Sequence, residues 1–252
     1  MNGYRWNAVT AATGYDEAAA IIHPRYQELQ DRILAQLPVN ATASFRVLDA
    51  GGGSGRLLER ILQRYPHAHG INLDQSEAFL SLAERRLHPF GSRIHYCQAR
   101  LQDNWETSLP GRPHYIVSMS AIHHLDHAEK EAFYRRCFAT IEPGGIFING
   151  DEVRPTSDED YLASLREWAL HMRRVLATGQ VSAAMQPTLE GWIQRNVNDF
   201  GVPKKSGDDC HETTAEQLQT LRKCGFTSVE QIWAQAMWAA FMGTKPNDRS
   251  GV

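Results

Sequence analysis

The chain has 252 residues, of which 42% are hydrophobic, 22% charged and 9% aromatic, and these proportions exclude a disordered or collagen-like protein. Its formal charge of −3, without a cluster of basic residues, argues against nucleic acid as a partner. No apolar stretch approaches the roughly 20 residues of a membrane helix, and the N-terminus carries no secretory signal, so we expect a cytoplasmic protein without membrane contact. The four cysteines form no CxxC pair and are expected to be reduced thiols.

Helical and strand patterns alternate through most of the chain, which predicts an α/β fold with a parallel sheet. Residues 1–38 are expected to hold an N-terminal lid and a one-faced helix over 24–37. Residues 39–155 are expected to form the core of the fold. Within this core, strands are predicted at 45–50, 69–73, 94–98, 115–120 and 146–149, and helices begin near 57, 76 and 126.

The alternation of helices and strands stops over residues 156–209, where two amphipathic helical patterns follow each other with no strand between them. We interpret this region as an inserted helical cap, in which Trp168 either lines a pocket or belongs to the core. Residues 210–246 are expected to return to the core, with a capping box from Thr214 to Gln217, a helix that stops at Gly225, and strands at 229–233 and 237–243. Residues 247–252 are expected to be a frayed tail.

A glycine-rich segment, Asp49-Ala50-Gly51-Gly52-Gly53-Ser54-Gly55, lies between the first predicted strand and the next helix. Glycines at such a turn let the backbone approach a ligand without obstruction by side chains. Arg56 stands where the dinucleotide fingerprint needs its third glycine, so the sequence favours another nucleotide-like ligand. Asp74, about 20 residues further on, could accept hydrogen bonds from a ribose diol, with Gln75 at the adenosine edge. An ordinary role at the helix N-terminus is the alternative for Asp74.

Five segments together resemble the class I S-adenosylmethionine-dependent methyltransferases, in their small-molecule branch with an inserted cap. They are VLDAGGGSG (47–55), LDQSEAFLSLAERRL (73–87), VSMSAIHHLDH (117–127), EPGGIFI (142–148) and the closing GF…W…FMGTKP (225–246). The resemblance covers nearly the whole chain. It implies a Rossmann-like sheet of seven strands, the last one antiparallel, flanked by helices, with S-adenosylmethionine as the cofactor.

The resemblance also implies which residues surround this cofactor. They are Asp49, Gly51, Gly53 and Gly55 at the methionyl moiety, Asp74 at the ribose, and Ser118 beside the methionyl amino group. The turn after the third strand would cover the adenine. Arg100 occupies a position that is commonly acidic in the family, and a guanidinium cannot accept a hydrogen bond from the adenine amino group. Leu101, Gln102 or Asp103 is therefore expected to serve instead.

Three side chains are candidates for catalysis. His123 and His124 follow the fourth strand at the carboxyl edge of the sheet, where open α/β sheets bind ligands, and either imidazole could act as a base on an acceptor. A purely structural role, with one ring capping the next helix, is the alternative. Tyr15 is the third candidate, because the aromatic N-terminal segment is typical of a lid in the family and a ring face attracts a sulfonium. Adding His127 gives three potential metal ligands, but no distant fourth ligand is evident, so we predict no metal.

These features predict an enzyme of small-molecule biosynthesis that transfers a methyl group in line to a metabolite enclosed by the cap and the lid. A homodimer is one oligomeric state that we consider. One alternative keeps the cofactor and changes the reaction, either to cyclisation into azetidine-2-carboxylate and methylthioadenosine or to carboxy-S-adenosylmethionine chemistry. A cofactor-binding regulator without turnover is another alternative.

Overall fold

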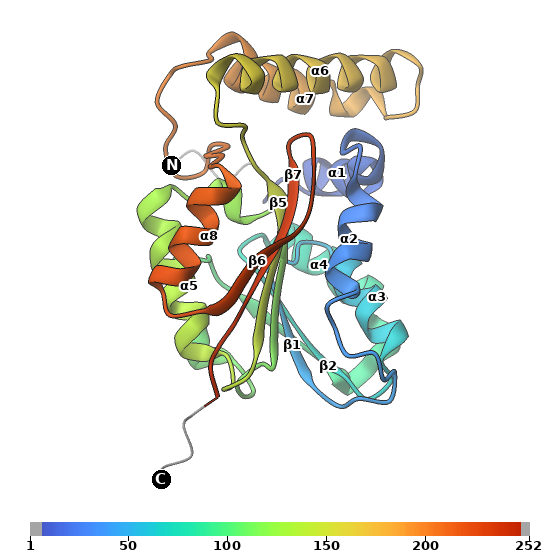
Figure 1. Cartoon of the computed structure of the whole chain (residues 1–252). Coiled ribbons are helices and arrows are strands. Elements are labelled where there is room, and N and C mark those ends of the chain that lie inside the picture. The colour runs from blue at the N-terminus through green and yellow to red at the C-terminus, as the bar shows by residue number, and fades with distance from the viewer. Residues whose placement is uncertain (1–6, 248–252) are drawn as a thin grey trace.

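A single seven-stranded sheet in the order β3-β2-β1-β4-β5-β7-β6 organises the computed structural model, which describes residues 7–247 (Figure 1). The strands are β1 (Arg46–Ala50), β2 (His69–Asp74), β3 (Ile94–Gln98), β4 (Tyr115–Met119), β5 (Ile146–Glu152), β6 (Thr227–Gln235) and β7 (Trp238–Thr244). All neighbours pair in parallel except β7, which is antiparallel to both β5 and β6. The predicted sheet is confirmed.

Helices cover both faces of the sheet, with α5 and α8 on one face and α2, α3 and α4 on the other (Figure 1). The helices are α1 (Val9–Ile22), α2 (Tyr26–Leu34), α3 (Arg56–Arg64), α4 (Glu77–Leu87), α5 (His127–Thr140), α6 (Asp158–Ala177), α7 (Gln186–Ile193) and α8 (Thr214–Lys223), with shorter turns η2 (His88–Arg93), η3 (Trp105–Ser108), η4 (Ile122–His124), η5 (Ala183–Met185) and the π-helical η6 (Gln194–Asn198). Capping explains two helix starts. The side chain of Ser76 accepts from the backbone of α4, and Asp126 and Glu129 form the predicted capping box of α5.

The strand order reverses between β1 and β4, because the chain returns from the edge strand β3 to the other side of β1. Such a switch point leaves a crevice beyond the carboxyl ends of the strands, and ligands bind there in open α/β sheets. Helices α6 and α7 lie across this end of the sheet, and α1 lies between them and the sheet (Figure 1). We call α6 and α7 the cap, and the topology predicts a ligand site between it and the sheet.

The cap is held to the rest of the molecule by apolar packing around Trp168, which is 5% exposed. Its indole N–H donates to the carbonyl of Ile22 at the end of α1, 2.7 Å away. Its ring lies 4.6 Å from that of Trp192 and 5.3 Å from that of Trp238, measured between centroids. The cap, α1 and the closing strand β7 are thus parts of one packed cluster.

The structure corrects several predicted boundaries. The region before residue 24 contains a full helix, α1, and the helix expected over 24–37 is α2, which spans only Tyr26–Leu34. Strand β5 continues three residues beyond the predicted end, because the antiparallel β7 pairs with it as far as Glu152. The capping box of α8 uses Thr213 and Glu216, one residue earlier than predicted, because the Thr213 hydroxyl is the one that reaches the Glu216 N–H.

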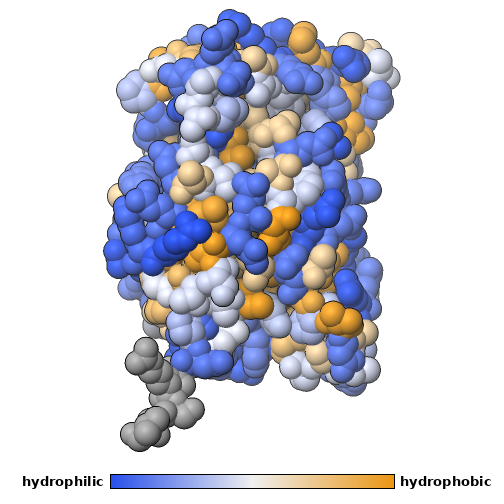
Figure 2. All heavy atoms as spheres, in the orientation of Figure 1, coloured by the Kyte–Doolittle hydropathy of each residue, from blue (hydrophilic) through white to orange (hydrophobic). Residues whose placement is uncertain are grey.

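The predicted lid, tail, thiols and absence of a membrane helix can each be compared with the described residues. The aromatic residues Tyr4 and Trp6 of the predicted lid lie outside the described residues, as does 248–252 of the predicted tail. All four cysteines are free thiols. Within residues 7–247, no helix combines the length and the apolar character that crossing a membrane would require. Figure 2 shows a face on which hydrophilic residues predominate and hydrophobic residues form small separate groups.

Candidate active site

The glycine-rich segment forms the turn between β1 and α3. Gly51, Gly53 and Gly55 all have positive φ, at 72°, 52° and 79°, a region that favours glycine. A side chain at Gly51 would also collide with Ala121, because its Cβ would lie 2.4 Å from that of Ala121. A Cβ at Gly53 would meet no atom within 4 Å. The turn is therefore tightly packed at its base and open at Gly53.

The open side of this turn faces a cavity of about 490 Å³, which we call the cofactor cavity. Its lining includes most of the predicted cofactor-binding residues, namely Asp49, Gly51, Gly53, Asp74, Gln75 and Leu101. It also includes two predicted catalytic residues, Tyr15 and His124, together with Arg100 and Gln102. Gly55 and Ser118 are not part of this lining. Gly55 begins α3 beside Leu87, and the buried Ser118 hydroxyl donates to the carbonyl of Ala50, 2.7 Å away inside the sheet. Asp103 instead accepts a hydrogen bond from the backbone of Arg100.

Two buried carboxylates mark the floor of the cofactor cavity. Asp74 accepts from the N–H of Gly53 (2.9 Å) and of Ser76 (2.8 Å), so it fixes both the glycine turn and the start of α4. Burial raises its pKa to about 6, although these backbone donors lower it. Asp49 is 1% exposed, and its Oδ2 has no hydrogen-bond partner among residues 7–247. Burial and the charge of Asp74 raise the pKa of Asp49 to about 7. Both groups would be stabilised as anions by a cationic ligand.

Helix α1 is tied over the glycine turn by Asp16, a residue that the sequence analysis did not select. Its carboxylate accepts from Arg56 Nε and Arg86 Nη2, both at 2.8 Å, and from the Ser54 hydroxyl. Burial raises the pKa of Asp16, but the hydrogen bonds from Arg86, Ser54 and Arg56 outweigh burial and lower it. Asp16 is therefore anionic at neutral pH and holds α1 in place as one wall of the cavity.

A second cavity of about 300 Å³ lies between α1, the cap and the sheet, and we call it the acceptor cavity. Its apolar lining is aromatic and aliphatic, with Ile22, Trp168, Met172, Leu189 and Trp192. Its polar lining is His23, His123, His124, Glu152, Arg195 and Asp209. Three residues, Tyr15, Ser120 and His124, line both cavities. Ser120 has a φ of 50°, an uncommon conformation for a residue other than glycine.

The three predicted catalytic residues thus lie close together but differ in their surroundings. The Tyr15 hydroxyl is 2.9 Å from His23 Nε2. His124 lies on the wall between the cavities, whereas His123 is buried and contacts only the acceptor cavity. The Nδ1 of His123 is 2.7 Å from Asp151 Oδ1. Burial lowers the pKa of His123, but the neighbouring carboxylates, led by Glu152 and Asp151, raise it to about 9.

The acidic partners of the histidines were missed because they lie far away in the sequence. Asp151 and Glu152 belong to the unpredicted end of β5. Asp209 lies in the loop before α8, which docks on η4 through hydrogen bonds from the N–H of Gly207 to the His124 carbonyl and from the N–H of Cys210 to the His123 carbonyl, both 2.8 Å. No local pattern in the sequence signals this docking.

Comparisons with known proteins agree with the topology and the glycine turn. A family model described as a methyltransferase domain matches residues 47–145. The carboxy-S-adenosyl-L-methionine synthase of Nitratiruptor sp. is 23% identical over 93% of this chain and 90% of its own length. The N-terminal Xaa-Pro-Lys N-methyltransferase 1 of Xenopus tropicalis is 30% identical over 56% of this chain and 62% of its own. The structure of human N-acetylserotonin methyltransferase in complex with SAM has a TM-score of 0.57 at 14% identity, covering 92% of this chain and 58% of that one.

Residues 47–145 match the methyltransferase-domain family model, and the sheet has the fold of the class I S-adenosylmethionine-dependent methyltransferases. These matches support S-adenosylmethionine as the cofactor. The chain spans about three fifths of the length of the Xenopus and human proteins, so its likeness to them covers the methyltransferase fold rather than their whole architecture.

The cofactor cavity suits S-adenosylmethionine on its own physical features. The methionyl end of this molecule carries an ammonium and a sulfonium, and Asp49 offers a buried carboxylate oxygen without a partner. Asp74 is placed to accept from the ribose hydroxyls, and the absence of atoms around a Cβ at Gly53 leaves room for the ligand. Arg100, Leu101 and Gln102 line the cavity beyond β3, where the adenine is expected.

The binding of S-adenosylmethionine by this methyltransferase is expected to weaken by about tenfold or more between pH 8 and pH 6. Asp49 has a pKa of about 7 in the empty protein, and a cationic ligand lowers this pKa, so binding releases a proton when the pH is below 7. Titration calorimetry at each pH measures the effect. In Asp49→Asn, the affinity should depend less on pH at the upper end of this range. A wild-type affinity that does not change between pH 8 and pH 6 would contradict the role of Asp49 as a partner of the cationic cofactor.

Proposed function

We propose that this enzyme transfers the methyl group of S-adenosylmethionine to a small molecule bound in the acceptor cavity. The observation that carries this proposal is that two separate cavities meet at one wall made of Tyr15, Ser120 and His124. A cofactor on one side and an acceptor on the other would face each other there. Holding two reactants in line at near-attack distance supplies a large part of the rate enhancement in such transfers.

The chain itself would position the acceptor and keep water away from it. It also provides the polar end of the acceptor cavity. When bound, S-adenosylmethionine supplies a methyl group activated by the positively charged sulfur. The apolar walls around Trp168 and Trp192 would hold a planar or apolar body of the acceptor and keep water out. His124 lies where the acceptor atom would meet the methyl group, so it is placed to orient the acceptor and to take its proton.

The size and lining of the acceptor cavity favour a metabolite over a protein chain. A volume of about 300 Å³ is at the low end for small-molecule sites. The acceptor of the human neighbour, N-acetylserotonin, is a small molecule, whereas the Xenopus relative acts on a protein N-terminus. We favour the first class because residues of α1 and of the cap helices line the cavity.

Mass spectrometry of the purified protein with S-adenosylmethionine and a fractionated metabolite extract tests the proposal. We expect S-adenosylhomocysteine, together with a product heavier than its precursor by one methylene, only in fractions that contain the acceptor. Thr188→Phe, which fills the acceptor cavity from α7, should reduce this product at least tenfold and leave cofactor affinity unchanged. Leu170→Phe, at an exposed position of the cap, is the matched control.

Other products would identify other reactions. Methylthioadenosine with a four-carbon amino acid, formed without any acceptor, would mean that the cofactor is cyclised. A carboxylated cofactor is the second candidate product, favoured by the alignment with the Nitratiruptor synthase over nine tenths of both chains. Either result would replace methyl transfer as the function, and a protein that fails to bind S-adenosylmethionine would overturn both proposals.

A further inference from the structure

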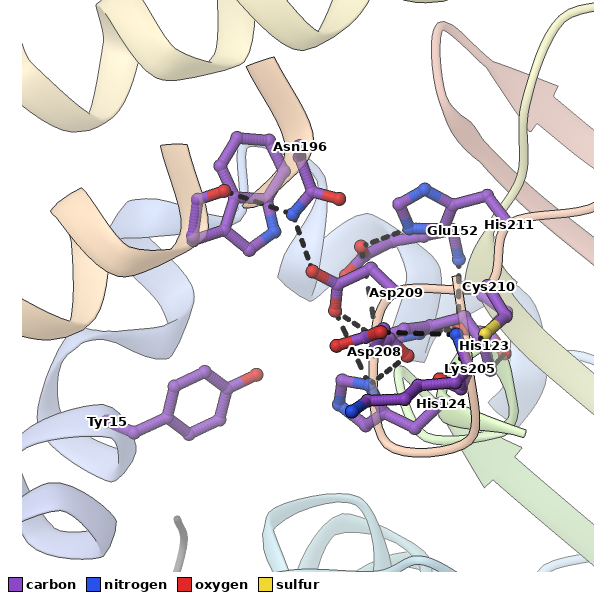
Figure 3. Close-up of polar contacts among 12 residues, drawn as sticks. Tyr15, His123, His124, Glu152, Asn196, Lys205, Asp208, Asp209, Cys210 and His211 are labelled. Carbon is purple, nitrogen blue, oxygen red and sulfur yellow. Dashed lines mark hydrogen bonds and ion pairs between the residues drawn. The ribbon is translucent and has the colours of Figure 1, made fainter. Parts of the chain in front are cut away.

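Four side chains converge at the polar end of the acceptor cavity (Figure 3). They are His123 and His124 of η4, Glu152 at the end of β5, and Asp209 from the loop before α8. One ring nitrogen from each histidine and one oxygen of Asp209 all lie within 4.8 Å of one another. Asp209 Oδ1 is 3.8 Å from His123 Nε2 and 3.4 Å from His124 Nδ1, and Glu152 Oε2 is 4.0 Å from His123 Nε2.

These separations are too long for hydrogen bonds and fit either ion pairs with a charged His123 or ligands around a metal ion. A hydrogen bond between nitrogen and oxygen needs about 3.2 Å or less. Two ligands at about 2.1 Å from one tetrahedral ion stand roughly 3.4 Å apart. The distances from His123 Nε2 to Glu152 and Asp209 exceed the hydrogen-bond limit and are only a few tenths of an ångström wider than the metal geometry.

Each of the buried ligands is oriented by a second polar group, as in known metal sites. Asp151 Oδ1 lies 2.7 Å from His123 Nδ1, which leaves Nε2 facing the cavity, where a metal ion would replace the proton that Nε2 carries in the charged ring. Asn196, from the π-helical turn η6, donates to Asp209 Oδ2 (2.5 Å), which leaves Oδ1 turned toward the histidines (Figure 3). His211 Nε2 is 3.0 Å from Glu152 Oε2.

His23 provides an independent sign that the cluster lacks a ligand. It is 6% exposed and lines the same cavity, yet its Nδ1 makes no hydrogen bond and lies 3.8 Å from Glu152 Oε1. A buried polar atom without a partner is costly, so such atoms mark places where an ion or ligand completes the structure.

We propose that His123, His124 and Asp209 bind one divalent first-row transition-metal ion, such as Zn²⁺ or Mn²⁺, with Glu152 beside them. Two imidazoles and a carboxylate form a donor set that suits these ions. The sequence argues against a metal when His127 is taken as the third ligand, because no distant ligand is evident from it. His127 lies instead 2.8 Å from Glu212, and the distant ligand is Asp209.

The position of the ion also suggests which acceptors would use it, and this part rests on the proposed function. The cluster borders the wall between the two cavities, so an open coordination position would face the acceptor. A bound cation lowers the pKa of an attached hydroxyl or amine and so favours its nucleophilic form. Acceptors that present oxygen or nitrogen are therefore expected, and His124 would then act as a ligand instead of as the base.

Metal binding can be measured without any acceptor. The whole chain is freed of metal by chelator and dialysis, then titrated separately with Zn²⁺ and Mn²⁺ by calorimetry and by thermal unfolding. We expect one equivalent of at least one of these ions to bind and to raise the melting temperature. Asp209→Asn should weaken binding by a hundredfold or more. Asn196→Ala, which keeps all three ligands, should weaken it by tenfold to a hundredfold.

His127→Gln is the matched control, because it changes an exposed histidine of the same motif and should bind metal like the wild type. If Asp209→Asn fails to fold by circular dichroism, His124→Gln takes its place. Substoichiometric binding, or equal binding by wild type and these variants, would overturn the metal site. Product assays with metal-free and metal-loaded protein keep the two proposals apart. Metal binding without methyl transfer would refute the proposed function alone, and transfer by a protein that binds no metal would refute the metal site alone.

Discussion

Replacing Asp74 with alanine is expected to reduce the affinity for S-adenosylmethionine by about a hundredfold. The carboxylate has two tasks, because it accepts from the N–H of Gly53 and of Ser76 and it also faces the cofactor cavity. Charge-assisted hydrogen bonds contribute about 1.5–3 kcal/mol each, and the loss of two to the ribose hydroxyls corresponds to roughly 3 kcal/mol or more. Titration calorimetry measures the change.

Two further variants serve as comparisons for Asp74→Ala. Asp74→Asn keeps an acceptor oxygen and should lose less, about tenfold. Asp103→Ala removes a nearby carboxylate that does not line the cavity, and it should bind the cofactor normally. If Asp74→Ala bound within threefold of the wild type, the ribose would have to be held by other residues.

The second large effect is expected from Asp16→Ala. Without this carboxylate, Arg56 and Arg86 lose the group that ties them to α1, and the wall shared by both cavities is released. Arg56 is partly exposed, so solvent recovers part of the loss, and we expect about 1–2 kcal/mol, or roughly tenfold in cofactor affinity. Hydrogen exchange of residues 9–22 should become faster in the variant.

The matched control for Asp16→Ala is Glu17→Ala, an exposed acidic neighbour on the same helix. It should leave both the affinity and the exchange of α1 unchanged. Wild-type exchange in Asp16→Ala would mean that apolar packing around Ala12, Ala18 and Ala19 holds α1 without the ion pairs.

Local signals made the central part of the fold predictable. Each of these signals lies within a few adjacent residues. They are the apolar strand before the glycine turn, the acidic residue at the end of β2 and the capping box at Asp126. Such patterns depend on backbone chemistry that is the same in every fold. The sequence therefore located β1 and the residues that line the cofactor cavity with small errors.

The acceptor side could not be predicted in the same way. The buried face of α1 consists largely of alanines, so it differs little in hydrophobicity from the exposed face. The sequence therefore gives only a weak helical pattern here, and the packing of α1 against α4 and α6 exists only in the folded chain. The last residues of β5 are polar, so the sequence does not indicate a strand there. The strand reaches Glu152 because it pairs with β7. Asp209 meets His123 and His124 across 85 residues of chain, through a loop whose docking depends on the finished fold.

The double role of α1 has a kinetic consequence. Tyr15 borders both cavities, and Asp16 beside it anchors the same helix to the glycine turn. If α1 moves as one element, both compartments open together and the spent cofactor and the product leave by the same route. In that case a change of acceptor alters the chemical step and leaves the rate of release nearly constant.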